Sequence, residues 1–337
     1  MSKKLKILAL FDINQPLNDF SKVAEFLKQE SWRDERDVIT ALKKGGHEVL
    51  AFGIYDKIEP LFFYIQKEKP DLIFNMCEGL AHMRHFEAQL IAFIELLHIP
   101  YTGSGWNALN VCKDKALSKQ LLSHRKVRVP QFLKIDQTAK KNVLDNFIFP
   151  AIVKPLNLEA SEGIAQASII KNRDEAWSRI IYLRESLHSD AIIEEFISGR
   201  EVYVGILGNQ RLEVFPPIEL FFKNCHKNED KIASYKVKWD KNHRKKLGVS
   251  TGPARKMNSV VFHELEVSAK IIYKTLGLKG YARLDFRINQ MGEVYFLEAN
   301  PNPSISRVDD FAKAAKSAGY EYEELIESIV YLGRHAA

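Results

Sequence analysis

Cysteine is scarce in this chain, and its spacing excludes a disulfide framework. The three cysteines among the 337 residues are Cys77, Cys112 and Cys225, and three widely separated thiols suit neither paired bridges nor a zinc-ligand cluster. Long apolar runs are also lacking. None approaches the roughly 20 residues of a membrane-spanning helix, and the apolar run after the basic residues 1–6 is too short for a signal peptide. These absences predict a cytoplasmic protein with no membrane partner.

Neither sign of charge is in large excess. The net charge of +6 comes from 49 basic against 43 acidic residues, and the segment 223–246 contributes much of it. That segment lacks the regularly spaced aromatic residues on which nucleic-acid bases stack, so we expect no nucleic-acid partner. Its composition is typical of a solvated, mobile loop, and it is compatible with a lid that faces phosphates.

What the sequence does contain is an alternation of strands and helices in its first hundred residues. The continuous apolar run 5–11 predicts a buried strand, and Val38, Ile39 and Leu42 form a helical stripe that ends at two glycines. A further strand in 70–76 and an amphipathic helix in 85–99 follow. This alternation predicts an α/β fold with a parallel sheet in its N-terminal part.

The remainder of the chain divides into two smaller pieces. A lysine-bearing helix over 113–122 and the strand in 149–155 belong to the first of them, and a hairpin over 280–303 belongs to the second. We therefore predict three units: an N-terminal α/β domain over 1–106, a small central subdomain over 107–193, and a C-terminal subdomain over 194–337. The last would carry a lid loop over 223–256 and the hairpin.

The hairpin carries charged side chains among apolar ones. In the register expected from its turn, Arg283 lies opposite Glu298, and Asp285 lies opposite Phe296. Four polar residues would then share one face of the sheet, namely Arg283, Asp285, Glu298 and Asn300. Two carboxylates and an amide suit Mg²⁺, which takes hard oxygen ligands and completes its octahedron with phosphates and water. A solvated sheet face with an Arg–Glu pair is the alternative.

Two lysines and an acidic strand point to a nucleotide. Lys154 interrupts the apolar strand "FPAIVKP", and a buried ammonium needs an anion close by. A lysine whose stem packs while its head reaches water is the alternative, and Lys115 could likewise be an exposed helix residue. In the segment "IIEEFISGREVYV", backbone groups could read an adenine edge and an acid could accept from ribose hydroxyls.

The order of these parts resembles the ATP-grasp superfamily and, more narrowly, the D-alanine–D-alanine ligases. The motifs that carry the resemblance span roughly residues 70 to 337 and read "IPYTGSG…DKALSK", "FPAIVKP", "IIEEFISGREVYVGILG" and "GYARLDFRI…GEVYFLEANPNP". Each fragment alone is weak, but the combination is specific. The resemblance implies an ATP-grasp architecture, in which two α+β domains sandwich ATP beside an N-terminal parallel α/β domain.

The resemblance also implies a role for each matching residue. Lys115 and Lys154 would hold the α- and β-phosphates, and Arg283 would sit by the transferred phosphate and the developing oxyanion. Lys238 and Trp239 would form the lid pair, with Trp in place of the usual Tyr. The adenine pocket would be lined by Glu194, Glu195, Phe196 and Ile197, and the ribose would be bound by Glu201. Two Mg²⁺ ions, which Mn²⁺ could replace, would be held by Asp285, Glu298 and Asn300.

The departures from the family pattern gather on the substrate side. The expected Gly-Gly-x-Ser-x-Glu turn is missing, and Glu35 is a displaced candidate for its glutamate. The family's His-Gly appears as Glu78-Gly79. Its Glu-Gly-Ser-Ser loop appears as residues 158–161, with Ala160 before Ser161. Ser304 replaces a glycine, and Asp309 stands where a serine would contact a carboxylate. These changes favour substrates other than two D-alanines, with a strict D-alanine–D-alanine ligase as the alternative.

The function expected from the whole pattern is an ATP-dependent ligase that joins a carboxylate to an amine through an acyl phosphate, releasing ADP and phosphate. Its partners would be ATP, small-molecule carboxylates and amines such as amino acids, and a second copy of the chain, because the resemblance implies a homodimer through the first domain. Two alternatives belong to other classes: a nucleotide-binding regulatory protein without turnover, and nucleic-acid binding through the 223–246 segment, which would weaken steeply with salt.

Overall fold

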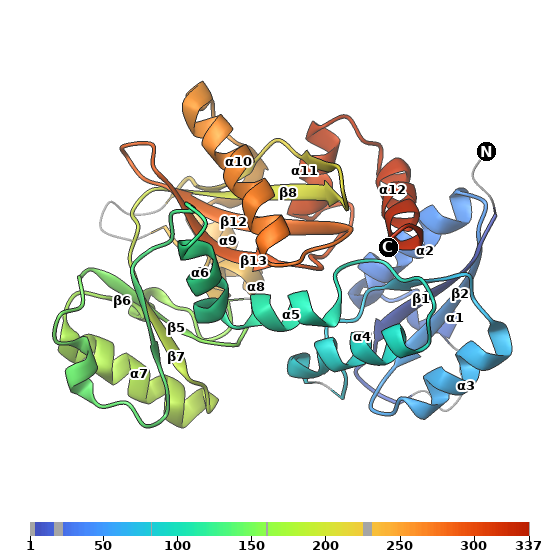
Figure 1. Ribbon diagram of the computed structural model, residues 1–337, viewed down its shortest axis with the longest axis horizontal. Helices are drawn as coiled ribbons and strands as arrows, with labels where there is room; N and C mark the ends of the chain where they lie inside the picture. The colour runs from blue at the N-terminus through green and yellow to red at the C-terminus, as the bar shows by residue number, and fades with distance from the viewer. Residues whose placement is uncertain (1–3, 17–22, 82, 160, 225–230, 337) are drawn as a thin grey trace.

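The chain folds around three β-sheets that follow one another along the sequence (Figure 1). The computed structural model describes residues 4–16, 23–81, 83–159, 161–224 and 231–336, so the predictions that involve Cys225 and Ala160 fall outside the described residues. Within those ranges, no helix combines the length and the apolar character needed to cross a bilayer.

The first sheet is parallel, as the alternation of elements predicts. Its three strands are ordered β2-β1-β3, with β1 at Lys6–Asp12, β2 at Glu48–Ile54 and β3 at Leu72–Asn75. Every residue of β3 is buried, as expected for a strand that is covered on both faces. The helices of this part are α1 (Val23–Phe26), α2 (Arg33–Lys44), α3 (Glu59–Glu68) and α4 (Glu87–Leu96).

The second sheet is antiparallel and carries Lys154, one of the two lysines predicted to bind phosphate, on β5. Its order is β4-β7-β5-β6, and its elements are β4 (Phe132–Ile135), β5 (Ala151–Pro155), β6 (Ile169–Ile170), β7 (Ala191–Glu195) and the covering helix α7 (Arg173–Leu187). The helix expected over 113–122 is in fact two helices, α5 (Trp106–Lys113) and α6 (Lys115–Ser123). The chain bends at Asp114, whose carboxylate accepts from the backbone N–H groups of Ala116 and Leu117 at 3.0 and 2.9 Å and so caps α6.

The third sheet contains the hairpin predicted over 280–303. Five strands follow the order β11-β10-β8-β12-β13, and β9 pairs with β8. The elements are β8 (Arg200–Gly208), β9 (Leu212–Val214), β10 (Ile218–Phe222), β11 (Val249–Pro253), β12 (Tyr281–Ile288), β13 (Val294–Asn300), α10 (Ser259–Thr275), α11 (Asp310–Ser317) and α12 (Tyr322–Arg334).

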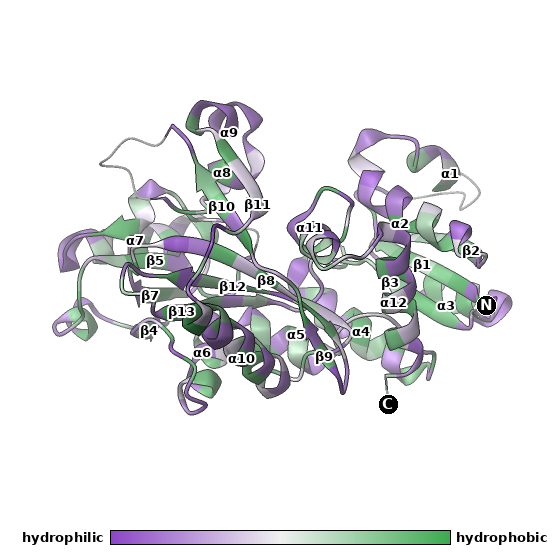
Figure 2. Ribbon diagram, turned by 90° about the horizontal axis from the view of Figure 1, so that it is seen from above, coloured by the Kyte–Doolittle hydropathy of each residue, from purple (hydrophilic) through white to green (hydrophobic). Residues whose placement is uncertain are grey.

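The basic segment is more ordered than its composition predicts. The expectation of a solvated loop is wrong for residues 235–247, which form the short helices α8 (Tyr235–Trp239) and α9 (Lys241–Leu247). Figure 2 shows these helices grouped with β10 and β11, with α9 coloured mainly as hydrophilic. The physical reason is that each helix buries an apolar residue, Val237 at 1% exposure and Leu247 at 7%, while every lysine of the two helices except Lys238 is exposed.

The C-terminal helix ties the first part of the chain to the last. α12 packs against α2 and β3, and it lies beside α2 in Figure 1. Its Leu325, Ile326 and Ile329 share one core with Leu42 of α2. The Nε2 atom of His47 lies 3.0 Å from the carboxylate of Glu327. Through these contacts, α12 holds the C-terminal part of the chain against the N-terminal domain.

Candidate active site

A β-bulge in the hairpin determines which of its charged residues face each other. Asp285 lies directly opposite Glu298, Arg283 lies opposite Asn300, and the register shifts by one residue between Asp285 and Phe286. The predicted register, with Arg283 opposite Glu298, is therefore wrong, whereas the predicted sharing of one face is correct. Leu297 is the extra residue of the bulge. Because of it, the aromatic rings of Phe286 and Phe296 meet in the core while the two carboxylates meet in the site.

Arg283 and Asp285 form a tight pair at the floor of the site. The guanidinium donates two hydrogen bonds to the carboxylate, from Nε at 2.8 Å and from Nη2 at 3.0 Å, and it lies 5.1 Å from the ring centroid of Tyr203. Burial raises the pKa of Asp285 above its usual value, against the pull of Arg283. Burial acts in the same direction on Glu298, but four nearby cations, of which Lys238 is the strongest, lower the pKa of Glu298 instead. Glu298 is thus held ionised.

A buried cluster of lysines faces the hairpin. Glu194 is fully buried, with Lys154 Nζ at 2.8 Å and Lys119 Nζ at 2.9 Å from its two oxygens. Burial would raise the pKa of Glu194, but these two ammonium groups lower it to about 2. Lys115 is 5% exposed, and its ammonium bonds only the carbonyls of residues 156 and 158 among the described contacts. Three buried cations therefore surround one buried anion.

This excess of positive charge decides between the two interpretations of Lys154. The lysine does not reach solvent with its head, because it is 8% exposed and its partner is Glu194. Glu194 alone cannot balance the charges of Lys115, Lys119 and Lys154. Burial lowers the pKa of both Lys115 and Lys119, which expresses the cost of taking an ammonium group out of water. The cluster fits a phosphate chain that would supply the missing negative charge.

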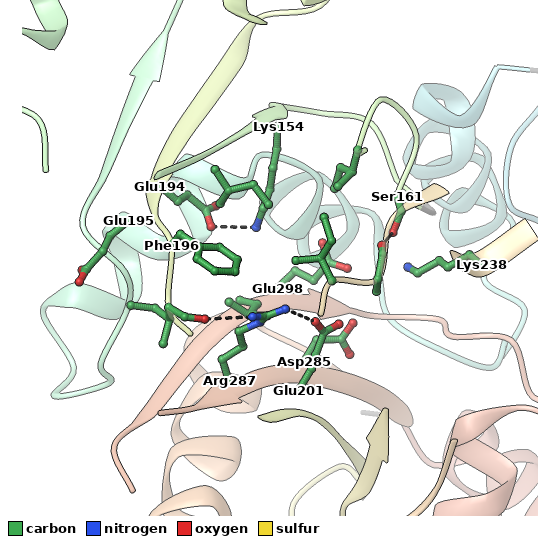
Figure 3. Close-up of a pocket in the computed structure, with 16 residues that line it drawn as sticks. Lys154, Ser161, Glu194, Glu195, Phe196, Glu201, Lys238, Asp285, Arg287 and Glu298 are labelled. Carbon is green, nitrogen blue, oxygen red and sulfur yellow. Dashed lines mark hydrogen bonds and ion pairs between the residues drawn. The ribbon is translucent and has the colours of Figure 1, made fainter. Parts of the chain in front are cut away.

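The acidic segment 194–201 lines a cavity, and Arg287 lies in the same cavity. Figure 3 shows Phe196 between the Lys154–Glu194 pair and Arg287. Arg287 donates to the carboxylate of Glu201 at 2.9 Å and to the carbonyl of Ile197 at 3.0 Å. Tyr203 donates its hydroxyl to the other oxygen of Glu201 at 3.0 Å. Glu201 is therefore oriented from two sides, as a carboxylate that accepts from a ligand should be.

The lid lies against the loop that follows β5. The hydroxyl of Ser161 donates to the carbonyl of Ala233 at 2.6 Å, and the backbone N–H of Tyr235 donates to the carbonyl of Ile164 at 2.9 Å. Lys238 lines two cavities, one with Asp285 and Glu201 and the other with Arg283 and Asn300. Its predicted companion, Trp239, is 56% exposed and lines only the larger cavity, the one that contains Arg283 and Asn300.

The predicted substrate residues divide between two connected cavities and the cavity of the predicted adenine pocket. Glu35, Glu78 and Ser304 line a cavity against the first domain. Asp309 lines the larger cavity, which also contains Arg283 and Glu298 and which we call the central cavity. The carboxylate of Asp309 accepts hydrogen bonds from the hydroxyls of Ser304 and Ser306. The structure places Ser161 apart from them, in the cavity that is lined by Glu194 to Ile197 and by Glu201.

The family follows from comparison with known proteins. The family model described as "D-ala D-ala ligase C-terminus" matches residues 120–331. The chain belongs to the D-alanine–D-alanine ligase family. This family consists of ATP-dependent ligases that form a C–N bond, which confirms the resemblance and the predicted class of enzyme.

Individual relatives of the family extend over most of the chain. It is 30% identical over 302 residues to the D-alanine–D-alanine ligase of Pelagibacter ubique, covering 88% of this chain and 90% of that one. It is 28% identical to the uncharacterized protein y4sG of Sinorhizobium fredii, covering 87% and 85%. Among solved structures, the D-alanine–D-alanine ligase of Bacillus anthracis complexed with ATP superposes with a TM-score of 0.74 at 19% identity, over 98% of both chains. This last likeness confirms the ATP-grasp fold.

Two residues that the structure brings into the site of this ligase-family chain were missed from the sequence. Lys119 lies four residues after Lys115, hence on the same helical face, and this spacing was available as a signal. Arg287 lies on the same strand face as Arg283 and Asp285 by simple alternation, but nothing in the sequence alone pairs it with Glu201.

Proposed function

We propose that this chain joins a carboxylate to an amine at the expense of ATP, by way of an acyl phosphate, and that its substrates differ from a pair of D-alanines. The observation that carries the proposal is the convergence of the buried lysine cluster with the face of Arg283, Asp285, Glu298 and Asn300. Cations for phosphates on one side of the site and acids for a divalent metal on the other are what phosphoryl transfer from ATP needs. The regulatory alternative has no such need for a complete set.

In the first step, an oxygen of the substrate carboxylate attacks the γ-phosphorus of ATP, and the bond from that phosphorus to the β-bridging oxygen breaks. Lys115 and Lys154 bind the non-reacting phosphates and hold the phosphate chain in line. Lys238 lies next to both carboxylates of the hairpin and acts on the charge that spreads over the transferred group. The products are an acyl phosphate and ADP.

In the second step, the amine attacks the acyl carbon and displaces phosphate, which accepts the proton that the amine loses. Negative charge develops on the carbonyl oxygen, and Arg283 is the cation positioned to meet it, because Asp285 fixes its guanidinium from behind. Although burial disfavours the charged form, Asp285 keeps the pKa of Arg283 above its ordinary value. The amine gives up its proton as the bond forms. Lid contacts through Ser161 and Tyr235 exclude water that would hydrolyse the acyl phosphate.

The donor set of the hairpin fits Mg²⁺. No group of three or more His, Cys, Asp or Glu residues in the described ranges is arranged to hold a metal alone, and the two carboxylates with one amide match an ion that takes its remaining ligands from phosphates and water. Asp285, Glu298 and Asn300 would hold the metal. Bound Mg²⁺ would neutralise charge on the phosphates and orient the γ-phosphate.

The experiment that tests the function is a measurement of ADP release with Mg²⁺-ATP against paired amino acids and amines. Release that requires both a carboxylate and an amine, with one amide product formed per ADP, supports the ligase. ATP binding without release for every pair would contradict it and favour the regulatory alternative. Release with D-alanine alone, giving dialanine, would contradict the proposed change of substrates while leaving the ligase intact.

We also propose that two copies associate through the first domain. Phe63 of α3 and Leu96 of α4 are large apolar side chains of this domain that are 67% and 76% exposed, and an interface between two copies would remove such surface from water. A dimer mass in light scattering that becomes a monomer mass in Phe63→Asp would support this. A monomer mass for the unaltered chain at micromolar concentration would contradict it.

A further inference from the structure

A second cavity continues the active site into the first domain. The central cavity, with Arg283 and Asn300, shares four lining residues with it, namely Glu78, Asn302, Pro303 and Ser304. The second cavity measures about 310 Å³, the space of roughly ten waters. A substrate as small as alanine, held with its carboxylate at Arg283, would leave most of this space unfilled.

The balance of charge differs between the two cavities. Among the described residues, seven lysines and arginines, including Lys115, Lys238 and Arg283, line the central one beside six acidic residues. No lysine or arginine among the described residues lines the second, which instead has four acidic residues in its wall: Asp12, Asp34, Glu35 and Glu78. We call these four residues and the space they enclose the acidic pocket.

Basic residues outside the wall neutralise the acidic pocket only in part. Arg84 reaches Glu78 at 2.9 Å and Arg33 comes within 3.7 Å of Asp34. Glu35 has no ion pair among the described contacts, and its Oε2 atom is buried without a hydrogen-bond partner. Burial, together with Asp34, Asp12 and Glu78, raises the pKa of Glu35 to about 7. A carboxyl in this condition gains from a cation that enters the pocket.

A separate observation also indicates a ligand in this pocket. Asn75, at the end of β3, lines it and is 1% exposed, and its Nδ2 donor has no hydrogen-bond partner in the described structure. Its Oδ1 is occupied by the backbone N–H of Cys77 at 3.2 Å, so the free group is the donor. A buried unpaired donor costs free energy unless a ligand oxygen reaches it. The pocket thus offers acceptors for a cation and one donor for an oxygen.

We propose that one of the two substrates is a basic amino acid, whose side-chain ammonium or guanidinium group enters the acidic pocket. This proposal rests on the ligase function above and names its substrate class. The shared chemistry is a flexible chain with a terminal cation. The free donor of Asn75 favours an amino acid, which has oxygens to offer, over a diamine, which has none. The aromatic side chains of Trp32 and Tyr281, which also line the pocket, suit the methylene stem of such a chain.

The test compares matched ligands at the unaltered protein. Lysine, ornithine and arginine in both stereochemical forms are titrated calorimetrically in the presence of Mg²⁺ and a non-hydrolysable ATP analogue, next to norleucine, alanine and cadaverine. We expect at least one basic amino acid to bind about a hundredfold more tightly than norleucine, because a site built for a polar group rejects an analogue that lacks it. Equal binding of norleucine, or preference for alanine or cadaverine, would overturn the proposal.

Variants connect the preference to the pocket. Glu35→Gln should reduce the preference for the basic amino acid over norleucine at least tenfold, with binding of the ATP analogue unchanged. Glu30→Gln is the matched control, because Glu30 is an 80% exposed carboxylate close in sequence that does not line the pocket, and it should keep the preference. A preference that survives Glu35→Gln and Asp34→Asn alike would overturn the assignment.

Binding and turnover separate this proposal from the function on which it rests. Tight binding of a basic amino acid that is lost in Glu35→Gln supports the pocket even if ADP is never released, an outcome that would overturn only the ligase. ADP release with neutral amino acids, which lysine neither replaces nor inhibits, would overturn the pocket and leave the ligase standing.

Discussion

Asp285 and Glu298 lie directly opposite each other on β12 and β13, one residue from a register shift in the hairpin. The bulge at Leu297 separates the two functions of this hairpin. On one side of it Phe286 and Phe296 are fully buried and stabilise the core, and on the other the facing carboxylates serve the site. A metal site built on paired strands is positioned more firmly than one built on loops.

Glu298→Gln should abolish most turnover without loss of the fold. Glu298 interacts with cations that face the site, first Lys238 and then Lys115 and Lys154, so neutralising it removes charge from the metal face and not from the core. We expect kcat for ADP release to fall about 10²- to 10³-fold, the size typical for loss of one electrostatic group.

The matched control for this variant is Glu293→Gln, at the other end of the hairpin, where Glu293 lies 3.6 Å from Arg128 and outside the three cavities of the site. It should retain kcat, and both variants should melt close to the unaltered protein. Full activity in Glu298→Gln would contradict the assignment of the metal site.

Lys119→Met should weaken nucleotide binding with little cost in stability. Without Lys119, Glu194 still has Lys154 at 2.8 Å, so the buried pair is balanced, but the positive excess that awaits phosphates falls. We expect the Kd for an ATP analogue to rise about tenfold, which corresponds to a charge interaction of one to two kcal/mol in a partly screened site. The same charge change at exposed Lys171 should leave the Kd unaltered.

Glu194→Gln should, in contrast to Lys119→Met, lower the stability of the protein. It leaves Lys119 and Lys154 buried without an anion, and loss of one partner from a buried ion pair costs about 3 kcal/mol or more. The melting temperature should fall by several degrees and recover in part when the ATP analogue binds, because its phosphates replace the missing charge. If Lys119→Met were the less stable of the two variants, the charge balance described for this cluster would be wrong.

Local periodicity predicted much of the fold and one face of the site. Alternation along β12 and β13 was enough to place Arg283, Asp285, Glu298 and Asn300 together, because a period of two fixes the face even when the register is shifted by two. The bulge was not predictable, since it depends on how two phenylalanines pack across the strands. Likewise, the many charged residues of 235–247 led to the prediction of a loop, although two buried apolar residues, Val237 and Leu247, stabilise α8 and α9 there.

Contacts between distant segments are what the sequence could not supply. Glu194 comes from β7, Lys154 from β5 and Lys119 from α6, and only the folded second sheet shows that one carboxylate serves two lysines. The acidic pocket likewise combines the end of β1, the start of α2, the end of β3 and the turn after β13. No spacing in the chain relates these four places.

Glu201→Gln should impair recognition of the ribose specifically. Its carboxylate is oriented by Arg287 and by Tyr203, and the amide keeps the shape while it halves the acceptors that ribose hydroxyls can use. The KM for ATP should rise about tenfold, in line with the loss of a hydrogen bond to a charged group. The KM for 2′,3′-dideoxy-ATP should not change. An equal rise for both nucleotides would contradict the ribose contact.

Glu87→Gln should alter how stability depends on pH. Glu87 is 8% exposed, and burial, followed by the charge of Glu159, raises its pKa to about 8. At a pH below the ordinary carboxyl value both folded and unfolded chains hold the proton. Above that value the unfolded chain releases its proton while the folded chain keeps it until about pH 8. Stability is therefore lost as pH rises through this window, by a few kcal/mol at most.

An amide at position 87 has no proton to lose, so the variant should escape this loss. Its melting temperature relative to the unaltered protein should rise by several degrees between pH 5 and pH 8. The exposed carboxylate of Glu59 offers the control, because Glu59→Gln should follow the unaltered protein at every pH. Parallel melting curves for Glu87→Gln and the unaltered protein would show that Glu87 is already ionised at pH 5, with Lys113, 3.8 Å away, as a sufficient partner.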